Sequence, residues 1–118
     1  MSGNLYHYKA YIASVYDGDT CTADIDLGLG VYVKGEKLRL SRINAPEVRG
    51  EERPMGLLSR DFLREKIDGK QVVIQTTKDK KGKYGRYLAE ILLADEAGNL
   101  VNVNDLLVES GFAKYAEY

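Results

Sequence analysis

A turn followed by a strictly alternating segment near the N-terminus is the feature that most limits the possible folds. Residues 8–16 are rich in β-branched and aromatic side chains and end at Asp17-Gly18, a dipeptide typical of tight turns. In residues 20–27 apolar and polar side chains alternate, and the apolar ones are Cys21, Ala23, Ile25 and Leu27. Because successive side chains of a strand point to opposite faces, this pattern predicts a half-buried strand with the apolar set on its buried face.

The strand pattern continues through much of the chain. Three further segments are predicted to be strands: residues 37–43, 71–77 and 84–93. In the first of them Leu38 and Leu40 share one face, and Arg39 lies on the opposite face. Glycines around residues 31–33 are typical of a loop or a short strand.

Two helices are predicted between and after these strands. Pro54 suits the first turn of a helix whose apolar face is formed by Met55, Leu58, Phe62, Leu63 and Ile67. Asp68-Gly69 is typical of the end of such a helix. Asn102 or Asn104 is expected to cap a shorter helix that stops before Gly111, and residues 112–118 are expected to form a strand or an extended tail.

Strands therefore dominate, with one helix inserted after the third strand and another near the end. This order predicts a mainly β fold with helices (α+β): a five-stranded Greek-key barrel of the OB type with two helices. The 118 residues suit one domain over residues 1–118, with a core from about residue 8 to residue 115.

Composition excludes several classes of protein. Hydrophobic residues make up 44% and charged residues 30%, and no apolar run is as long as a membrane span, so no membrane association is expected. Residues 1–8 lack a basic region followed by an apolar one, so a cytoplasmic protein is expected, or a secreted one if a leader has been removed. With one cysteine (Cys21) and one histidine (His7), neither a disulfide nor a cysteine or histidine metal cluster is expected.

Residues 78–86 carry the strongest cluster of positive charge. Five basic residues stand there against one acidic residue, although the whole chain has a net charge of −1. Two interpretations are open: a solvated hairpin tip kept soluble by lysines, or a surface that attracts the nucleic-acid backbone.

Several acidic and arginine side chains near turns are either candidate site residues or ordinary surface residues. Asp17 and Asp19 flank one turn, Glu47 follows Pro46 in a short loop, and arginines stand at 39 and 86. Taken singly, each is more typical of a surface turn or a surface ion pair than of a functional site.

Taken in order, these segments resemble the staphylococcal nuclease family. The resemblance covers residues 15–20, 38–40, 43–47, 79–86 and 101–114. It implies an OB barrel with an active site on one face of its sheet, and hydrolysis of phosphodiester bonds with calcium.

The resemblance also implies roles for individual residues. Asp19 is similar to the side-chain ligand of calcium, Asn44 stands where the best-known members carry a second acidic ligand, and Ala45 would offer its backbone carbonyl. Because the amide of Asn44 is neutral, weaker calcium binding is expected. Glu47 is similar to the glutamate proposed as general base for the attacking water.

The remaining implied roles concern phosphate groups. Arg39 and Arg86 resemble two arginines that grip the scissile phosphate, and Lys83 and Tyr84 match positions that contact a terminal phosphate. Further attraction to the backbone is expected from Lys78, Lys80 and Lys81.

The function predicted from the sequence is therefore a calcium-dependent nuclease acting on DNA, RNA or both. Single-stranded nucleic acid is the expected partner, and no obligate protein partner is indicated. The alternative is a catalytically weak or inactive OB module that binds nucleic acid or protein.

Overall fold

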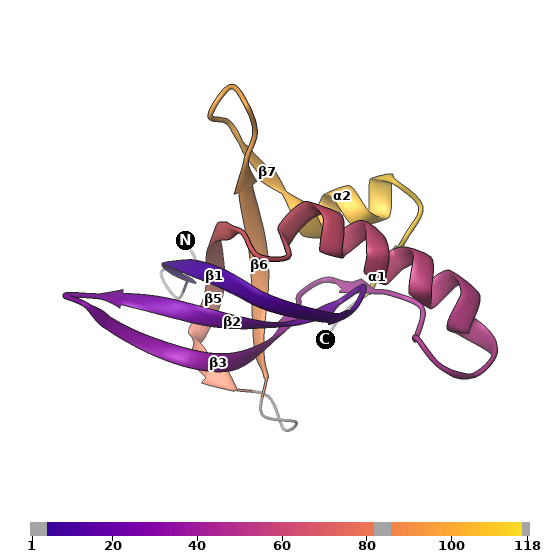
Figure 1. Cartoon of the computed structure of the whole chain (residues 1–118), viewed down its shortest axis with the longest axis horizontal. Helices are drawn as coiled ribbons and strands as arrows, with labels where there is room; N and C mark the ends of the chain where they lie inside the picture. Colours follow the sequence, from indigo (N-terminus) through magenta and orange to yellow (C-terminus); the bar gives the residue numbers. More distant parts are fainter. Residues whose placement is uncertain (1–4, 82–85, 117–118) are drawn as a thin grey trace.

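The computed structural model describes residues 5–81 and 86–116 of the chain. Within this part, the barrel strands are β1 (Leu5–Asp17), β2 (Thr20–Gly28), β3 (Val31–Leu40), β5 (Gln71–Lys81) and β6 (Tyr87–Ala94). The helices α1 (Arg53–Ile67) and α2 (Val103–Glu109) lie on the same side of the barrel (Figure 1). Neither described helix is long and apolar enough to cross a membrane.

The sheet closes on itself. The strands pair in the order β3-β2-β1-β5-β6, and β3 also pairs with β6. All neighbours are antiparallel except β3 and β6, whose parallel pairing sets Leu38 beside Tyr87 and Leu40 beside Ala89. This closed order is that of a Greek-key OB barrel, so the predicted fold, a five-stranded barrel with two helices, is confirmed.

The alternation of β2 is observed in most of the strand. Cys21 and Ala23 are at most 1% exposed, and Ile25 is 6% exposed. Leu27, which was predicted to be on the buried face, is 48% exposed. The prediction fails there because the ends of β2 and β3 form a hairpin that extends past the barrel (Figure 1).

The β3 strand carries side chains of opposite character on its two faces, as predicted. Leu38 and Leu40 are fully buried, and the side chain of Arg39 lies on the other face. The expected strand over residues 37–43 is divided, because Arg42 adopts a φ of 67° after β3 ends. The chain then forms β4 (Ile43–Asn44), which pairs with β8 (Lys114–Tyr115), so the C-terminal segment returns as a short strand.

Helix α1 follows the short 3-10 turn η1 (Gly50–Glu52) and has Pro54 in its first turn, as predicted. Its buried face differs from the prediction. Met55 and Leu58 are 47% and 54% exposed. The buried positions are instead Gly56, Ser59, Leu63 and Ile67. Small residues occupy the N-terminal half of this face because other backbone segments approach the helix closely there.

Helix α2 is joined to the barrel by two asparagines. Asn102, in β7 (Leu100–Asn102), is the N-cap, and its side chain accepts a hydrogen bond from the Asp105 N–H at 3.0 Å. Asn104, the other predicted cap, is fully buried inside α2 instead. Its amide bonds three backbone groups, those of Ile91, Ser41 and Ala89. Buried polar groups require such partners, so Asn104 joins α2 to the barrel wall.

A charged network on β6 joins the same elements. Glu90 accepts hydrogen bonds from Arg42 at 2.8 and 2.6 Å, from Asn102 at 3.0 Å and from the Ser41 hydroxyl. Arg42 also pairs with Asp105 at 2.9 Å. Burial opposes the charge of Glu90, but the hydrogen bonds outweigh it and lower the pKa of Glu90. The network therefore stabilises the ionised carboxylate.

Candidate active site

The residues given catalytic and calcium-binding roles from the sequence line one pocket of about 440 Å³ at the barrel surface. It is lined by Asp17, Asp19, Thr20, Arg39, Asn44, Ala45, Glu47, Arg86 and Ala116. These residues come from the β1–β2 turn, the end of β3, the segment from β4 into the following loop, the start of β6 and the C-terminal segment. The fold thus brings together side chains that are far apart in the sequence.

Asp19 lies at the floor of this pocket, in the turn between β1 and β2, and is only 5% exposed. Its Oδ2 accepts the Ala45 N–H at 2.8 Å and lies 3.3 Å from Nη2 of Arg39. Its Oδ1 accepts the Thr20 hydroxyl at 3.2 Å. Asp17 orders the turn by accepting the N–H of Asp19 at 3.1 Å. The carboxylate is therefore held in one orientation.

Burial raises the pKa of Asp19 to about 6. The hydrogen bond with Asp17 and the charge of Asp17 contribute to this rise, whereas the Ala45 N–H and Arg39 oppose it. Such a carboxyl group is costly to ionise unless positive charge is added beside it. A cation in this pocket would favour its ionised form.

Arg39 is fixed by four oxygen atoms. Nη1 donates to the carbonyls of Leu40 and Ile43 at 3.0 and 3.2 Å. Nη2 donates to Oδ1 of Asn44 at 3.2 Å and pairs with Asp19 at 3.3 Å. The side chain of Arg39 is 11% exposed, and its guanidinium contacts β3, β4 and the β1–β2 turn. Such a planar cation, already oriented, is suited to binding an anionic ligand.

Glu47 is exposed at the rim of the pocket, in the loop before α1. Its N–H donates to the Glu52 side chain at 3.2 Å. Gly56 sets the distance between this loop and α1. A Cβ at Gly56 would lie 1.9 Å from the carbonyl oxygen of Glu47 and 2.9 Å from the nitrogen of Val48. Only glycine permits this approach, so Gly56 positions the loop that carries Glu47.

A second glycine allows a similar approach on the other side of the pocket. A Cβ at Gly18 would lie 2.0 Å from the Ser59 hydroxyl and 2.8 Å from the Cβ of Ala45. Ser59 is fully buried in α1 and donates to the carbonyl of Phe112 at 2.8 Å. Helix α1 is therefore the common support of the Asp19 turn, the Glu47 loop and the C-terminal segment.

The structure describes only some of the basic residues that were predicted to bind phosphate. Arg86 lines the pocket just before β6. The backbone of Lys78, Lys80 and Lys81 lies in β5, which leads towards this region, but their side chains are not among those described. Lys83 and Tyr84 lie outside the described residues, so their contacts with phosphate stay predictions.

Comparison with known proteins identifies the family. A family model described as staphylococcal nuclease homologue matches residues 37–118, which is more than half of the chain. The chain belongs to the staphylococcal nuclease family. The resemblance inferred from the short motifs is thereby confirmed.

Individual relatives of this staphylococcal nuclease homologue are distant. An uncharacterized protein of Methanocaldococcus jannaschii is 30% identical over 131 residues, covering 92% of this chain and 59% of the relative. A thermonuclease of Staphylococcus intermedius is 28% identical over 104 residues, covering 86% and 58%. A thermonuclease of Staphylococcus hyicus is 28% identical over 120 residues, covering 99% and 63%. The chain thus spans about three fifths of the length of these curated relatives.

Sequence reasoning gave no site role to several residues that shape the pocket of this family member. Thr20 lines it directly, and Gly18, Gly56 and Ser59 set the distances around it. One signal was present in the sequence: a glycine within an amphipathic helical pattern usually has a packing reason. The close approach of Ser59 and Gly18, which are far apart in the sequence, has no comparable signal.

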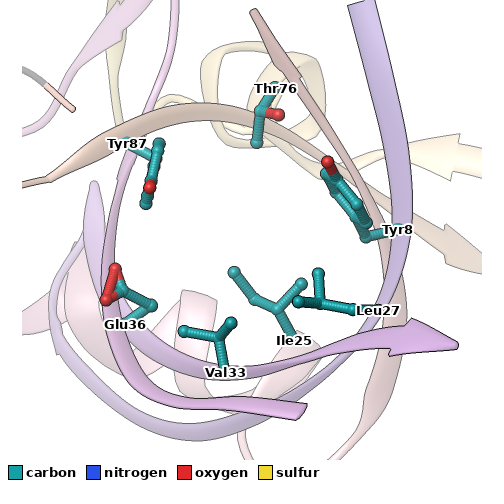
Figure 2. Close-up of a pocket in the computed structure, with 7 residues that line it drawn as sticks. All are labelled: Tyr8, Ile25, Leu27, Val33, Glu36, Thr76 and Tyr87. Carbon is teal, nitrogen blue, oxygen red and sulfur yellow. The ribbon is translucent and has the colours of Figure 1, made fainter. Parts of the chain in front are cut away.

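A separate cavity lies inside the barrel of this nuclease homologue. It measures about 180 Å³ and is lined by Tyr8, Ile25, Leu27, Val33, Glu36, Thr76 and Tyr87 (Figure 2). These side chains point inward from the strands around it, and none of them lines the pocket of Asp19 and Arg39. The inner cavity is thus distinct from the candidate active site.

Proposed function

We propose that this chain is a calcium-dependent nuclease that hydrolyses phosphodiester bonds of DNA or RNA. The observation that carries the proposal is the arrangement of Arg39, Glu47, Arg86 and Asp19 around one pocket of about 440 Å³. Membership of the staphylococcal nuclease family and the likeness to two thermonucleases support the same activity.

The two arginines are proposed to bind the scissile phosphate. A phosphodiester is anionic, and negative charge increases on its equatorial oxygens during attack by water. Guanidinium groups bind such oxygens in pairs and stabilise that charge in a partly closed pocket. Arg39 suits this role because the carbonyls of Leu40 and Ile43 already hold its Nη1.

Glu47 is proposed as the general base. Its carboxylate is exposed at the rim of the pocket, where water has access, and its backbone is held by Glu52 and by the close approach of Gly56. A positioned carboxylate that takes a proton from water contributes roughly 10²–10⁴-fold to rate. The proton would move from the water to an oxygen of Glu47 as the water oxygen bonds to phosphorus. The bond between phosphorus and the leaving ester oxygen would break, and that oxygen would take a proton from solvent and leave as an alcohol.

The donors in the pocket suit calcium. The described residues contain no group of three or more His, Cys, Asp or Glu side chains able to hold a metal, so mixed oxygen donors are needed. Asp19, the amide oxygen of Asn44 and the carbonyl of Ala45 are all hard oxygen donors of the kind calcium prefers. Oxygens of Asp19 and Asn44 contact Nη2 of Arg39 at 3.3 and 3.2 Å, so a cation would replace Arg39 beside them. Bound there, calcium would supply charge neutralisation for the phosphate and acidify water.

The substrate is proposed to be single-stranded nucleic acid. Lys78, Lys80 and Lys81 add sequence-independent attraction to phosphates, and Lys83 and Tyr84 are proposed to contact a terminal phosphate. An aromatic side chain such as Tyr84 also offers a surface on which an unpaired base stacks.

One observation favours a second candidate function. Asn44 brings no negative charge to the pocket, and its oxygen is bonded to Arg39 at 3.2 Å. Weak cation binding would leave an OB module that binds nucleic acid without cleaving it.

Cleavage of a fluorescent single-stranded oligonucleotide, with calcium and with excess chelator, tests the proposal. Glu47→Gln keeps the shape of the side chain and removes the proton acceptor, so we expect turnover to fall by about 10²–10⁴-fold with similar affinity. Glu51→Gln is the matched control, because Glu51 is an exposed neighbour outside the pocket. Equal activity of the two variants would refute the base role. Intact substrate with retained binding at saturating calcium would favour the binding module.

A further inference from the structure

A second, larger pocket adjoins the candidate active site. It measures about 750 Å³ and lies between the β1–β2–β3 surface and α1. Thr20 and Arg86 line both pockets, so the two adjoin at these residues. A ligand that extends beyond the scissile phosphate can therefore reach the second pocket across Thr20 and Arg86.

The second pocket is strongly basic. Lys37, Arg60, Arg64 and Arg86 line it, and no carboxylate is among its described lining residues. Hydroxyl groups of Ser14, Thr20 and Thr22 add neutral hydrogen-bond donors. Arg49 adds another cation nearby, because its Nη2 donates to the hydroxyl of Tyr16, a lining residue, at 2.7 Å. This concentration of positive charge contrasts with the net charge of −1 of the whole chain.

Lys37 continues the face of β3 that carries Arg39. The pairing of β3 with β2 is regular here, with Arg39 opposite Thr20 and Lys37 opposite Thr22. Residues two apart on a strand share a face and are about 6–7 Å apart. This separation is of the order of the distance between neighbouring phosphates in an extended single strand. Both cations can thus meet successive phosphates of one chain.

The arginines from α1 differ in how firmly they are held. Arg64 donates to the carbonyl of Val15 at 3.3 and 3.1 Å, which fixes its guanidinium against β1. Arg60 pairs with Asp61 at 3.1 Å, and the Asp61 side chain is 60% exposed. Because exposed ion pairs contribute little free energy, Arg60 can exchange this partner for a phosphate at small cost.

We propose that this second pocket binds the backbone phosphates that flank the scissile phosphate in single-stranded nucleic acid. The proposal rests on the proposed nuclease function for the position of the scissile phosphate. It predicts that the chain recognises a polynucleotide rather than a dinucleotide. A single strand can bend into two adjoining pockets, whereas a duplex presents its phosphates on a convex, rigid surface.

The test is the salt dependence of oligonucleotide binding. Fluorescence anisotropy with calcium in the Glu47→Gln background keeps the substrate intact. The probes are a labelled single-stranded 12-mer and a labelled dinucleotide, and the variants are Lys37→Gln, Arg60→Gln and the two combined. Lys34→Gln is the matched control, because Lys34 is an exposed lysine of β3 outside this pocket. Arg64 is left unchanged since it supports the backbone at Val15.

Each lost phosphate contact should lower the slope of log affinity against log salt by about 0.7 for a single strand. The combined variant should therefore lose roughly ten-fold in affinity for the 12-mer relative to the dinucleotide, while Lys34→Gln keeps the starting slope. An unchanged slope, or an equal loss for the dinucleotide, would overturn the proposal. If the 12-mer binds with the expected slopes but the unmutated chain does not cleave it, the nuclease function fails and this binding surface stands.

Discussion

Replacing Gly56 by alanine tests how the candidate base is positioned. The new Cβ would lie 1.9 Å from the carbonyl oxygen of Glu47 and 2.4 Å from its carbonyl carbon. An ordinary contact begins at 3.4 Å, so the loop and α1 must separate by about 1.5 Å. Both atoms belong to backbone, and no side-chain rotation relieves the overlap. The loop that carries Glu47 is expected to move.

Two effects on stability oppose each other. Alanine is favoured over glycine inside a helix by about 1 kcal/mol. Overpacking of a buried site costs about 1–3 kcal/mol, and an overlap with backbone lies at the upper end of that range. We therefore expect Gly56→Ala to lower the free energy of unfolding by about 2 kcal/mol, which corresponds to a decrease in Tm of roughly 8 °C.

The effect on activity is expected to be larger. A misplacement of about 1 Å in a catalytic group costs on the order of 100-fold in rate. Gly56→Ala should therefore lower kcat/KM by about 100-fold, measured well below its Tm with circular dichroism confirming the fold. Leu58→Ala is the control, because Leu58 lies on the same helix and is 54% exposed. A Gly56→Ala protein that is more stable by about 1 kcal/mol and fully active would refute the close contact between α1 and the Glu47 loop.

Three further predictions concern single side chains. Asn44→Asp should tighten calcium binding, since it adds a negative charge to the pocket, and an unchanged calorimetric titration would exclude residue 44 as a ligand. Glu90→Gln should cost about 1–3 kcal/mol in urea denaturation at pH 7. Because the pKa of Glu90 is lowered in the folded chain, this cost should be full above the ordinary pKa and should decrease as pH falls below it. Asp19→Asn should stabilise the calcium-free chain at pH 7 and have no such effect near pH 4; a loss of stability at pH 7 would show that burial does not dominate at this carboxyl group.

Local patterns were sufficient to predict most of the barrel. The alternation in β2 and the placement of Leu38 and Leu40 opposite Arg39 follow from the two-residue period of a strand, which needs no knowledge of the partner strands. The ordered set of short motifs also named residues that the fold brings together around one pocket. Arg39 and Glu47 came from that order rather than from any single match.

The wrong burial predictions occur where the distance between two elements determines which side chains are covered. Helical periodicity placed Met55 and Leu58 on the buried face of α1, whereas Gly56 and Ser59 are buried there. Hydrophobicity predicts which residues are buried when side chains fill the space between two elements. At the N-terminal half of α1 the backbone of neighbouring segments fills that space, so only small residues fit. Leu27 was wrong for another reason: it lies near the end of β2, where its side chain lines the barrel cavity and no described core residue covers it (Figure 2).

Two carboxylates of this chain, Glu90 and Asp19, influence stability in opposite directions when they ionise. Glu90 belongs to the network that joins β6 to α2, and Asp19 belongs to the candidate active site. The pKa of Glu90 is lowered, so its ionisation stabilises the fold above the ordinary pKa. The pKa of Asp19 is raised from 3.8 to about 6, so the folded chain binds the proton more tightly than the unfolded chain does, and stability falls as pH rises between those values. Ionising such a carboxyl group costs free energy, and Arg39, 3.3 Å from it, offsets only part of that cost. A cation bound beside Asp19, as proposed, would offset more of it, whereas Glu90 needs no ligand because its partners already belong to the fold.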